Sequence, residues 1–202
     1  MAAWQDPPWL RFGRTVSQRI GLFFTFVYRR RIDSVRSEPK GVITRVVGAA
    51  ELAPFLGADY DLDADFVAEA TARGDRCVAN FLGDELVGYA WIAYGPTPHL
   101  DGVWCETGSP DRYAYKAFTH PRFRGKRLRG TFHALEADDA AFGVTHSVSF
   151  IAWWNRSSMK AIARNQAVRI GWAGYWTIGT RRFCFRSPGA RRAGFRFFVP
   201  RE

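Results

Sequence analysis

The sequence predicts an α/β fold in which a sheet carries helices on its faces. Runs rich in β-branched and aromatic residues alternate with segments of helical periodicity along most of the 202 residues. Hydrophobic residues make up 47% of the chain, which is enough for a substantial core, and a chain of this length suits one compact domain. The expected order is two strands, two helices, a hairpin, a strand, a helix, a strand, a helix and two strands.

The first forty residues are expected to form a basic arm with an edge strand, ahead of a domain over residues 41–202. Residues 1–20 contain Pro7 and Pro8 and few apolar residues at regular spacing, so they are interpreted as the arm. Aromatic and β-branched residues from Phe23 to Arg30 predict the edge strand. The two parts together are expected to behave as a single domain.

The apolar run from Ile20 to Tyr28 does not predict a membrane span. It is far short of the ~20 residues that cross a bilayer, and no signal-peptide cleavage site follows it. An edge strand with a basic flank is favoured over a basic segment that touches a membrane surface. The run Val42–Val47 predicts the next strand.

Residues 49–95 predict two helices and a hairpin. Pro54 shortens or kinks the first helix, which begins in "AAELAPF". The second helix, "FVAEATARG", follows three alternating aspartates, which are expected to cap its positive end rather than to bind calcium. Two strand-like runs flank Gly83 and Asp84, which predicts a β-hairpin. The aspartates are Asp61, Asp63 and Asp65.

The second half of the chain predicts a further strand–helix alternation. A strand is expected over Arg112–Thr119 and a fully buried one over Ser147–Trp154. A helix over Asn155–Gly171 is expected to lead into a strand pair through "YWTIG" and "RRFCFR". Between the first two strands lies a helix, ended by Gly143, with one apolar stripe formed by Leu128, Phe132, Leu135 and Phe142.

Charge and cysteine usage narrow the class of protein. The formal net charge is +10, and two ends of the chain are rich in arginine, Pro7–Ile32 and Arg181–Glu202. Such a surface favours nucleic acid, membrane headgroups, CoA phosphates or an acidic carrier protein as partners. Three widely spaced cysteines argue against a disulfide framework and for reduced thiols in the cytoplasm, and scattered histidines predict no structural metal.

The segment "HPRFRGKRLRG", His120–Gly130, combines five basic residues besides its histidine with two glycines. It lies where a predicted strand ends and a predicted helix begins. Helix N-termini leave backbone N–H groups unpaired and carry a partial positive charge, so they favour anions. Glycine permits close approach of the backbone to phosphate, and arginine or lysine adds charge-assisted contacts. The segment therefore predicts a phosphate-binding loop.

This arrangement resembles the GNAT superfamily of N-acetyltransferases. In that family a strand leads through "HPxxRGxGxG" into a helix, and the loop amides bind the pyrophosphate of acetyl-CoA. The next strand ends near an asparagine, and the following helix closes with "GF". The counterparts here, "AFTHPRFRGKRLRG", "FIAWWN" and "IGW", fall within residues 42–185. The resemblance implies a mixed, mostly antiparallel twisted sheet with helices on both faces, and acetyl-CoA or another acyl-CoA as cofactor.

The resemblance also implies which residues meet the cofactor. Arginines at 127 and 129 replace the two usual glycines, so either the loop amides or the arginine side chains would hold the pyrophosphate. Backbone groups on the two neighbouring strands would meet the pantetheine arm, and an asparagine would lie beside it. The implied residues are Arg124, Gly125, Lys126, Arg127, Leu128, Arg129 and Gly130 in the loop, Phe118, Thr119, Phe150 and Ile151 on the strands, and Asn155.

Catalysis in that family is direct acyl transfer from the thioester to an amine, with a base and a proton donor. The usual acidic pair late in the strand is replaced by Tyr115 and Lys116, and the helix after Asn155 has no tyrosine. Substitutes must come from elsewhere, although each is more often a structural residue. They are Glu106 and Asp111 as bases, and Tyr113, Tyr115 and Tyr175 as proton donors.

The function expected from this resemblance is transfer of an acetyl or longer acyl group from a CoA thioester to an amine. An acidic acyl carrier protein could replace CoA as the donor, because the ends of the chain are rich in arginine. The amine could belong to a small molecule or a protein, and the acids near Gly95–Ser109 suit a cationic acceptor. Two alternatives stay open: a basic nucleic-acid-binding protein, which is less favoured, and an inactive acyl-CoA-binding member of the fold.

Overall fold

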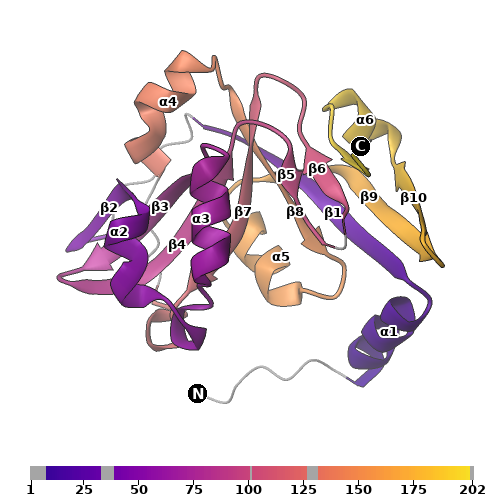
Figure 1. The fold of residues 1–202 in the computed structure, drawn as a ribbon, viewed down its shortest axis with the longest axis horizontal. Coiled ribbons are helices and arrows are strands. Elements are labelled where there is room, and N and C mark those ends of the chain that lie inside the picture. The colour runs from indigo at the N-terminus through magenta and orange to yellow at the C-terminus, as the bar shows by residue number, and fades with distance from the viewer. Residues whose placement is uncertain (1–7, 33–38, 101, 127–131, 201–202) are drawn as a thin grey trace. The chain divides into compact units, whose positions relative to one another are not determined.

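The computed structural model describes residues 8–32, 39–100, 102–126 and 132–200. It has the predicted fold class, a mixed α/β arrangement with mostly antiparallel strands and several helices (Figure 1). The contacts divide the chain into two compact units. The first unit comprises Met1–Arg30, Pro96–Gly108 and Val148–Glu202, and the second comprises Arg31–Gly95 and Ser109–Ser147.

The second unit is built on four antiparallel strands in the order β7-β4-β3-β2. Helices pack against both faces, as predicted. On one face Leu52 and Val67 pack with the strand residue Trp91, and on the other Leu135 packs with Ile92. The elements are β2 (Val42–Val47), α2 (Ala49–Leu52), η1 (Ala53–Phe55), η2 (Ala58–Tyr60), α3 (Ala64–Ala72), β3 (Arg76–Leu82), β4 (Glu85–Ala93), β7 (Asp111–Thr119), η3 (Pro121–Phe123), η4 (Phe132–Leu135) and α4 (Glu136–Ala141).

Local signals in the sequence set these boundaries. The Asp63 side chain caps α3, because its Oδ1 accepts hydrogen bonds from the amides of Asp65 and Phe66 at 2.9 and 3.2 Å. Pro54 lies where α2 gives way to the short 3₁₀ turn η1. Gly83 has φ +59 and forms the tight turn between β3 and β4. These three predictions are confirmed.

A buried ion pair fixes α4 to the strands. Arg112 on β7 and Asp139 on α4 are both buried and in direct contact. The Tyr94 hydroxyl donates to the other carboxylate oxygen of Asp139 at 3.1 Å. A buried charge is tolerated only when it is paired, so this pair fixes the position of the helix on the sheet.

The first unit contains strands in the order β10-β9-β1-β8 and a small sheet in the order β11-β6-β5. The pairs β10–β9, β9–β1, β11–β6 and β6–β5 are all antiparallel. The elements are α1 (Pro8–Arg19), β1 (Leu22–Arg31), β5 (Thr97–Pro98), β6 (Trp104–Glu106), β8 (His146–Ala152), α5 (Arg156–Ala163), β9 (Val168–Ile178), β10 (Arg181–Arg186), α6 (Pro188–Arg192) and β11 (Arg196–Phe198).

Two expectations for the N-terminal segment are wrong. The strand β1 lies between β9 and β8, so it is not an edge strand. The arm contains the helix α1, which begins at Pro8. Proline at the first helical position is well tolerated, because its missing N–H would have no partner there. The division expected at residue 40 stays a prediction.

The helix expected over Asn155–Gly171 is also shorter than predicted. The helix α5 ends at Ala163, and Gln166 adopts a left-handed conformation with φ 58. Strand β9 then begins at Val168, and Gly171 and Trp172 pair with Val27 and Phe26 of β1 rather than closing a helix. The β-branched and aromatic residues of this stretch favour the strand once β1 is available as a partner. The proposed match of "IGW" to a helix end is therefore wrong.

The helix expected after the basic loop is described only in part. It contains the 3₁₀ turn η4 followed by the six-residue helix α4. Of the predicted stripe, Leu135 is fully buried, whereas Phe142 is exposed and stacks on Tyr94 at 4.5 Å between ring centroids. Gly143, with φ +62, follows the end of the helix as predicted. Leu128 lies outside the described residues.

Candidate functional site

The end of β7 has an irregular backbone where the predicted cofactor contacts begin. Trp91 on β4 pairs with Tyr115, and Tyr89 pairs with Phe118, so one residue of β4 opposes Lys116 and Ala117 of β7. Lys116 has φ 41, a left-handed conformation that is rare for a residue with a side chain. The irregularity is a β-bulge, and a bulge turns the side chains that follow it and leaves backbone groups outside the ladder.

Phe118 and Thr119 continue β7 beyond the bulge. They pair with Tyr89 and Gly88 of β4, and the Phe118 ring stacks on Tyr89 at 5.4 Å. A Cβ on Gly88 would lie 2.5 Å from the Phe118 carbonyl oxygen, so only glycine permits this approach. The backbone of both predicted cofactor residues is therefore held rigidly against β4.

The basic segment after β7 folds as a tight turn. His120 donates its amide to Val87 O at 2.9 Å, and the 3₁₀ turn Pro121–Phe123 follows. Gly125 has φ +80, and no atom of the described residues lies within 4 Å of the position that a Cβ would occupy. The turn thus requires glycine for its backbone conformation, and the space beside that glycine is open with respect to this part of the chain.

The cations of this turn are only partly engaged. Arg124 Nε donates to the carbonyl of Thr119 at 3.0 Å, which ties the side chain to the end of β7. Lys126 Nζ lies 5.4 Å from the centroid of the Phe123 ring. Both groups are available to an anion beside Gly125, because a cation–π contact at an exposed position is weak. The remaining loop residues predicted to bind the cofactor, Arg127, Leu128, Arg129 and Gly130, lie outside the described residues.

The other predicted cofactor residues belong to the first unit. The Phe150 ring on β8 lies 5.0 Å from the Phe197 ring within an aromatic cluster, and Ile151 is buried. Asn155 caps α5, since its Oδ1 accepts from the Ser158 amide at 3.1 Å. Its place beside a cofactor stays a prediction, and the oxygen of its side-chain amide is already bonded to the Ser158 amide.

Tyr115 belongs to a hydrogen-bonded network that sequence reasoning missed. Its hydroxyl donates to Asp75 Oδ2 at 2.6 Å, and Arg73 donates to the same oxygen through Nε and a terminal nitrogen at 3.2 and 3.0 Å. Burial and the hydrogen bond to Asp75 raise the pKa of Tyr115 well above its usual value. The hydroxyl therefore keeps its proton at neutral pH and directs it at Asp75.

Glu106 and Tyr175 occupy structural positions in the first unit. Glu106 Oε1 accepts from Arg196 Nε at 2.6 Å, across the strand pair β6–β11. The buried Tyr175 ring stacks on Phe23 at 5.1 Å. Catalytic roles for Glu106, Tyr115 and Tyr175 stay predictions, and each side chain has a defined packing or hydrogen-bonding partner.

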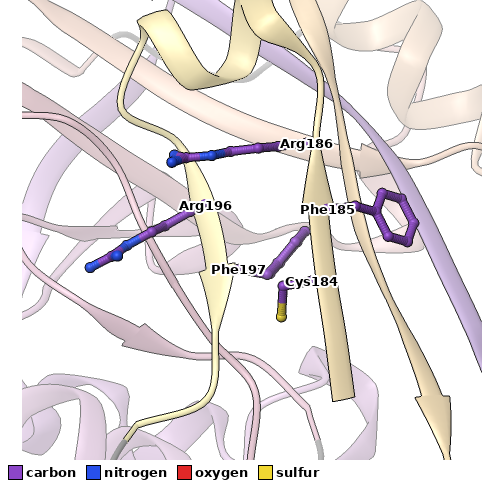
Figure 2. Close-up of a pocket in the computed structure, with 5 residues that line it drawn as sticks. All are labelled: Cys184, Phe185, Arg186, Arg196 and Phe197. Atoms are coloured by element: carbon purple, nitrogen blue, oxygen red, sulfur yellow. The ribbon is translucent and has the colours of Figure 1, made fainter.

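A small cationic cavity opens between β10 and β11 (Figure 2). It measures about 180 Å³ and is lined by Cys184, Phe185, Arg186, Arg196 and Phe197. Burial lowers the pKa of Arg186, and repulsion from Arg191 and Arg196 lowers it further. The cavity is distant in sequence from the basic turn, and no residue lining it was predicted to bind a cofactor.

No group of three or more His, Cys, Asp and Glu side chains in the described ranges is placed to hold a metal ion. Among the described helices, none is long and apolar enough to cross a bilayer.

Comparison with known proteins gives a likeness in fold. No family model and no curated protein matches the chain. A conserved Staphylococcus epidermidis protein of unknown function aligns with a TM-score of 0.51 and 10% identity, over 85% of this chain and 68% of that one. A tandem GNAT protein from the clavulanic acid biosynthesis pathway aligns with a TM-score of 0.50 and 14% identity.

The alignment with the tandem GNAT protein covers 100% of this chain and 62% of that chain. A Drosophila protein aligns at 13% identity with a TM-score of 0.45, over 81% of this chain and 55% of that one. The two alignments with TM-scores of 0.51 and 0.50 indicate a similar fold, and identities this low do not transfer an activity. The fold of this chain is thus similar to that of a GNAT protein.

Proposed function

We propose that the protein transfers an acetyl or longer acyl group from a CoA thioester to an amine. The observation that carries the proposal is the end of β7, where a bulged central strand runs directly into a basic turn with an open glycine. This arrangement occurs in a fold similar to that of a tandem GNAT protein. The amine nitrogen would attack the thioester carbonyl carbon, the carbon–sulfur bond would break, and the thiolate would take up a proton.

The residues of the turn fit the phosphates of such a donor. Arg124 and Lys126 supply two cations, and the open space at Gly125 lets a phosphate oxygen approach the backbone. The rigid ladder between β4 and β7 would hold Phe118 and Thr119 in place for the pantetheine arm. An acylated carrier protein would present its acyl group on the same kind of pantetheine arm.

The side chains predicted to transfer protons are held in other contacts. The Tyr115 proton points at Asp75, and its raised pKa makes it a poor acid for a thiolate. The Glu106 carboxylate is held by Arg196. These contacts favour, as the second candidate function, an inactive member that binds acyl-CoA without turnover.

Acyl transfer is tested by incubating the protein with acetyl-CoA, longer acyl-CoAs or acylated carrier protein and a panel of cationic amines. Acylated amine should be followed by mass spectrometry, because the exposed Cys184 would react with a thiol reagent. Product formation above the uncatalysed rate supports the proposal. Binding of thioester without product by folded protein supports the inactive member, and neither binding nor product contradicts both.

A matched pair of variants connects activity to the turn. Arg124→Gln with Lys126→Gln should reduce kcat/KM chiefly through KM, because both cations are proposed to hold phosphate. Lys40→Gln with Arg45→Gln removes the same charge from exposed positions of the same unit outside the turn, and should leave kcat/KM within about twofold. Equal losses in the two double variants would show that the turn has no specific role.

A further inference from the structure

The positive charge of the protein belongs to the first unit. This unit holds sixteen of the 29 lysines and arginines and four of the 19 acidic residues, whereas the second unit holds thirteen and fifteen. The formal net charge is therefore +12 for the first unit and −2 for the second. A surface of the first unit is expected to attract an anionic partner, whereas the second unit, with a net charge of −2, adds no net long-range attraction.

One face of β10, β9 and β1 carries large apolar side chains in register. Residues directly opposite each other in a sheet lie on the same face, so the pairings Leu22↔Trp176 and Trp176↔Phe183 place these three together. The next row joins Phe24 and Phe185 across Gly174. This surface is named the aromatic face, and its main members are Phe24, Phe26, Trp172, Trp176, Ile178 and Phe183.

The aromatic face is exposed. Trp172, Trp176, Ile178 and Phe183 retain 41%, 46%, 50% and 52% of their surface. The opposite face of the same strands is covered: Tyr175 is buried against Phe197. Figure 2 shows the two sides of β10, with the Phe185 ring on one and the Arg186 side chain on the other. The exposed side is thus not the core of the unit.

The rings on this face are held in place. Phe24 stacks on Trp172 with 5.8 Å between centroids. A Cβ on Gly174 would lie 2.8 Å from the Phe185 ring, so this ring lies across the glycine. Trp176 Nε1 donates to Ile20 O at 2.6 Å, which satisfies the indole N–H without solvent. The face thus presents a preformed apolar surface, and the indole N–H of Trp176 on β9 is already paired.

Cations flank this surface. Arg169 lies over the Phe26 ring at 4.8 Å, at one end of the aromatic face. Arg181 pairs with Ile178 at the other end. Beside it the helix α1 ends, and Val16 and Ile20 are exposed there at 38% and 49%. Apolar side chains thus form an unbroken centre with arginines at its ends.

We propose that the aromatic face docks on an anionic lipid bilayer. Tryptophan and phenylalanine would enter the headgroup boundary, and the arginines would contact lipid phosphates, as in other interfacial proteins. A second copy of the chain is a poorer occupant, because two units of charge +12 would repel. Single-stranded nucleic acid is also poorer, because its binding grooves place cations along the stacked bases, not only beyond them. The proposal does not depend on acyl transfer.

Docking is tested by flotation of the full chain with vesicles of phosphatidylcholine alone or with about one-third phosphatidylglycerol. Ile178→Ser with Phe183→Ser should lower the partition coefficient onto anionic vesicles roughly tenfold or more. The matched control, Ile43→Ser with Phe142→Ser, changes the same residue types at 59% and 58% exposure in the second unit and should leave binding unchanged. Circular dichroism and melting confirm that both variants fold.

The charge contribution has its own pair of variants. Arg169→Gln with Arg181→Gln should weaken binding to anionic vesicles by about fivefold per charge and should make binding less sensitive to salt. Lys40→Gln with Arg122→Gln is the control from the second unit.

Three results would overturn the proposal. The first is no binding of folded protein to anionic vesicles at low salt. The second is an equal loss in aromatic-face and control variants. The third is that the Ile178→Ser, Phe183→Ser variant loses oligonucleotide binding or self-association but still binds vesicles like the parent protein.

Discussion

Cys77 shows how burial alone changes the chemistry of a side chain. It is 1% exposed among apolar neighbours, and this burial raises the pKa of its thiol to about 12. In the unfolded chain a cysteine titrates at about 8.5. The folded state therefore binds the thiol proton more tightly than the unfolded state. The contribution of this difference to the free energy of unfolding is fully present below pH about 8.5 and is lost as the pH rises toward 12.

The free energy of unfolding should fall between pH 8 and 10, approaching about 1.4 kcal/mol per pH unit above the unfolded pKa. Urea denaturation at several pH values measures this slope. Cys77→Ala should reduce the slope, whereas Cys184→Ala at an exposed position should reduce it less. The same slope in Cys77→Ala and in the parent protein would contradict the assignment.

Tyr115 shows what the sequence could not predict at the scale of a residue. The sequence predicted its position on a strand. The resemblance to the GNAT superfamily indicated that it stands where that family usually has an acidic residue. Its partner Asp75 lies 40 residues away, and no local pattern indicates that contact. The same holds for Arg112 and Asp139, whose pairing depends on how α4 packs on the sheet.

Among the contacts between elements, the buried Arg112–Asp139 pair joins β7 to α4. Asp139→Asn leaves the Arg112 charge buried without compensation and should lower the free energy of unfolding by about 3–5 kcal/mol. The neighbouring Asp138 forms a partly exposed ion pair with Arg76, so Asp138→Asn should lower the free energy of unfolding by about 1 kcal/mol or less. Urea denaturation measures both.

The double variant Arg112→Met with Asp139→Leu provides the control for this pair. It removes both charges at once and should recover most of the lost stability. A double variant as unstable as Asp139→Asn would show that packing, and not the unpaired charge, causes the loss.

Gly125 carries a prediction about the turn. Its φ of +80 strains any residue with a Cβ, although the space around it is open. Gly125→Ala should therefore cost about 1 kcal/mol of stability, and Gly125→Asn should cost less because asparagine tolerates this conformation. Gly95→Ala, also in open space but with φ outside the left-handed region, should cost nothing measurable. Equal stability of Gly125→Ala and the parent, by thermal melting, would contradict this description of the turn.

The accuracy of the predicted elements depends on where their determinants lie. Asp63, Pro54 and Gly83 act within a few residues, and the elements that they limit were predicted correctly. Residues 168–172 were assigned to a helix because the strand there depends on pairing with β1, which is distant in sequence. The short strands β5, β6 and β11 were also missed, since strands of two or three residues show no periodicity in the sequence.

At the scale of the whole molecule, sequence order and fold class were predictable, and the detail of the candidate site was predictable only in part. The strand–turn arrangement around Gly125 follows from local residues. The contacts of Glu106 and Tyr115 join residues distant in sequence, so no local pattern predicts them, whereas the Asn155 cap forms within its own helix turn. The two units also differ in formal net charge: the first is strongly cationic and the second is nearly neutral.

Isothermal titration with acetyl-CoA and with longer acyl-CoAs measures whether the basic turn binds an acyl donor. We expect one site per chain, with affinity reduced about tenfold or more by Arg124→Gln with Lys126→Gln. Replacing Arg127 and Arg129 with glycine should preserve or strengthen binding if the loop amides hold the pyrophosphate, and should abolish it if the arginine side chains do. No heat of binding with any acyl-CoA, from protein that melts cooperatively, would contradict the account.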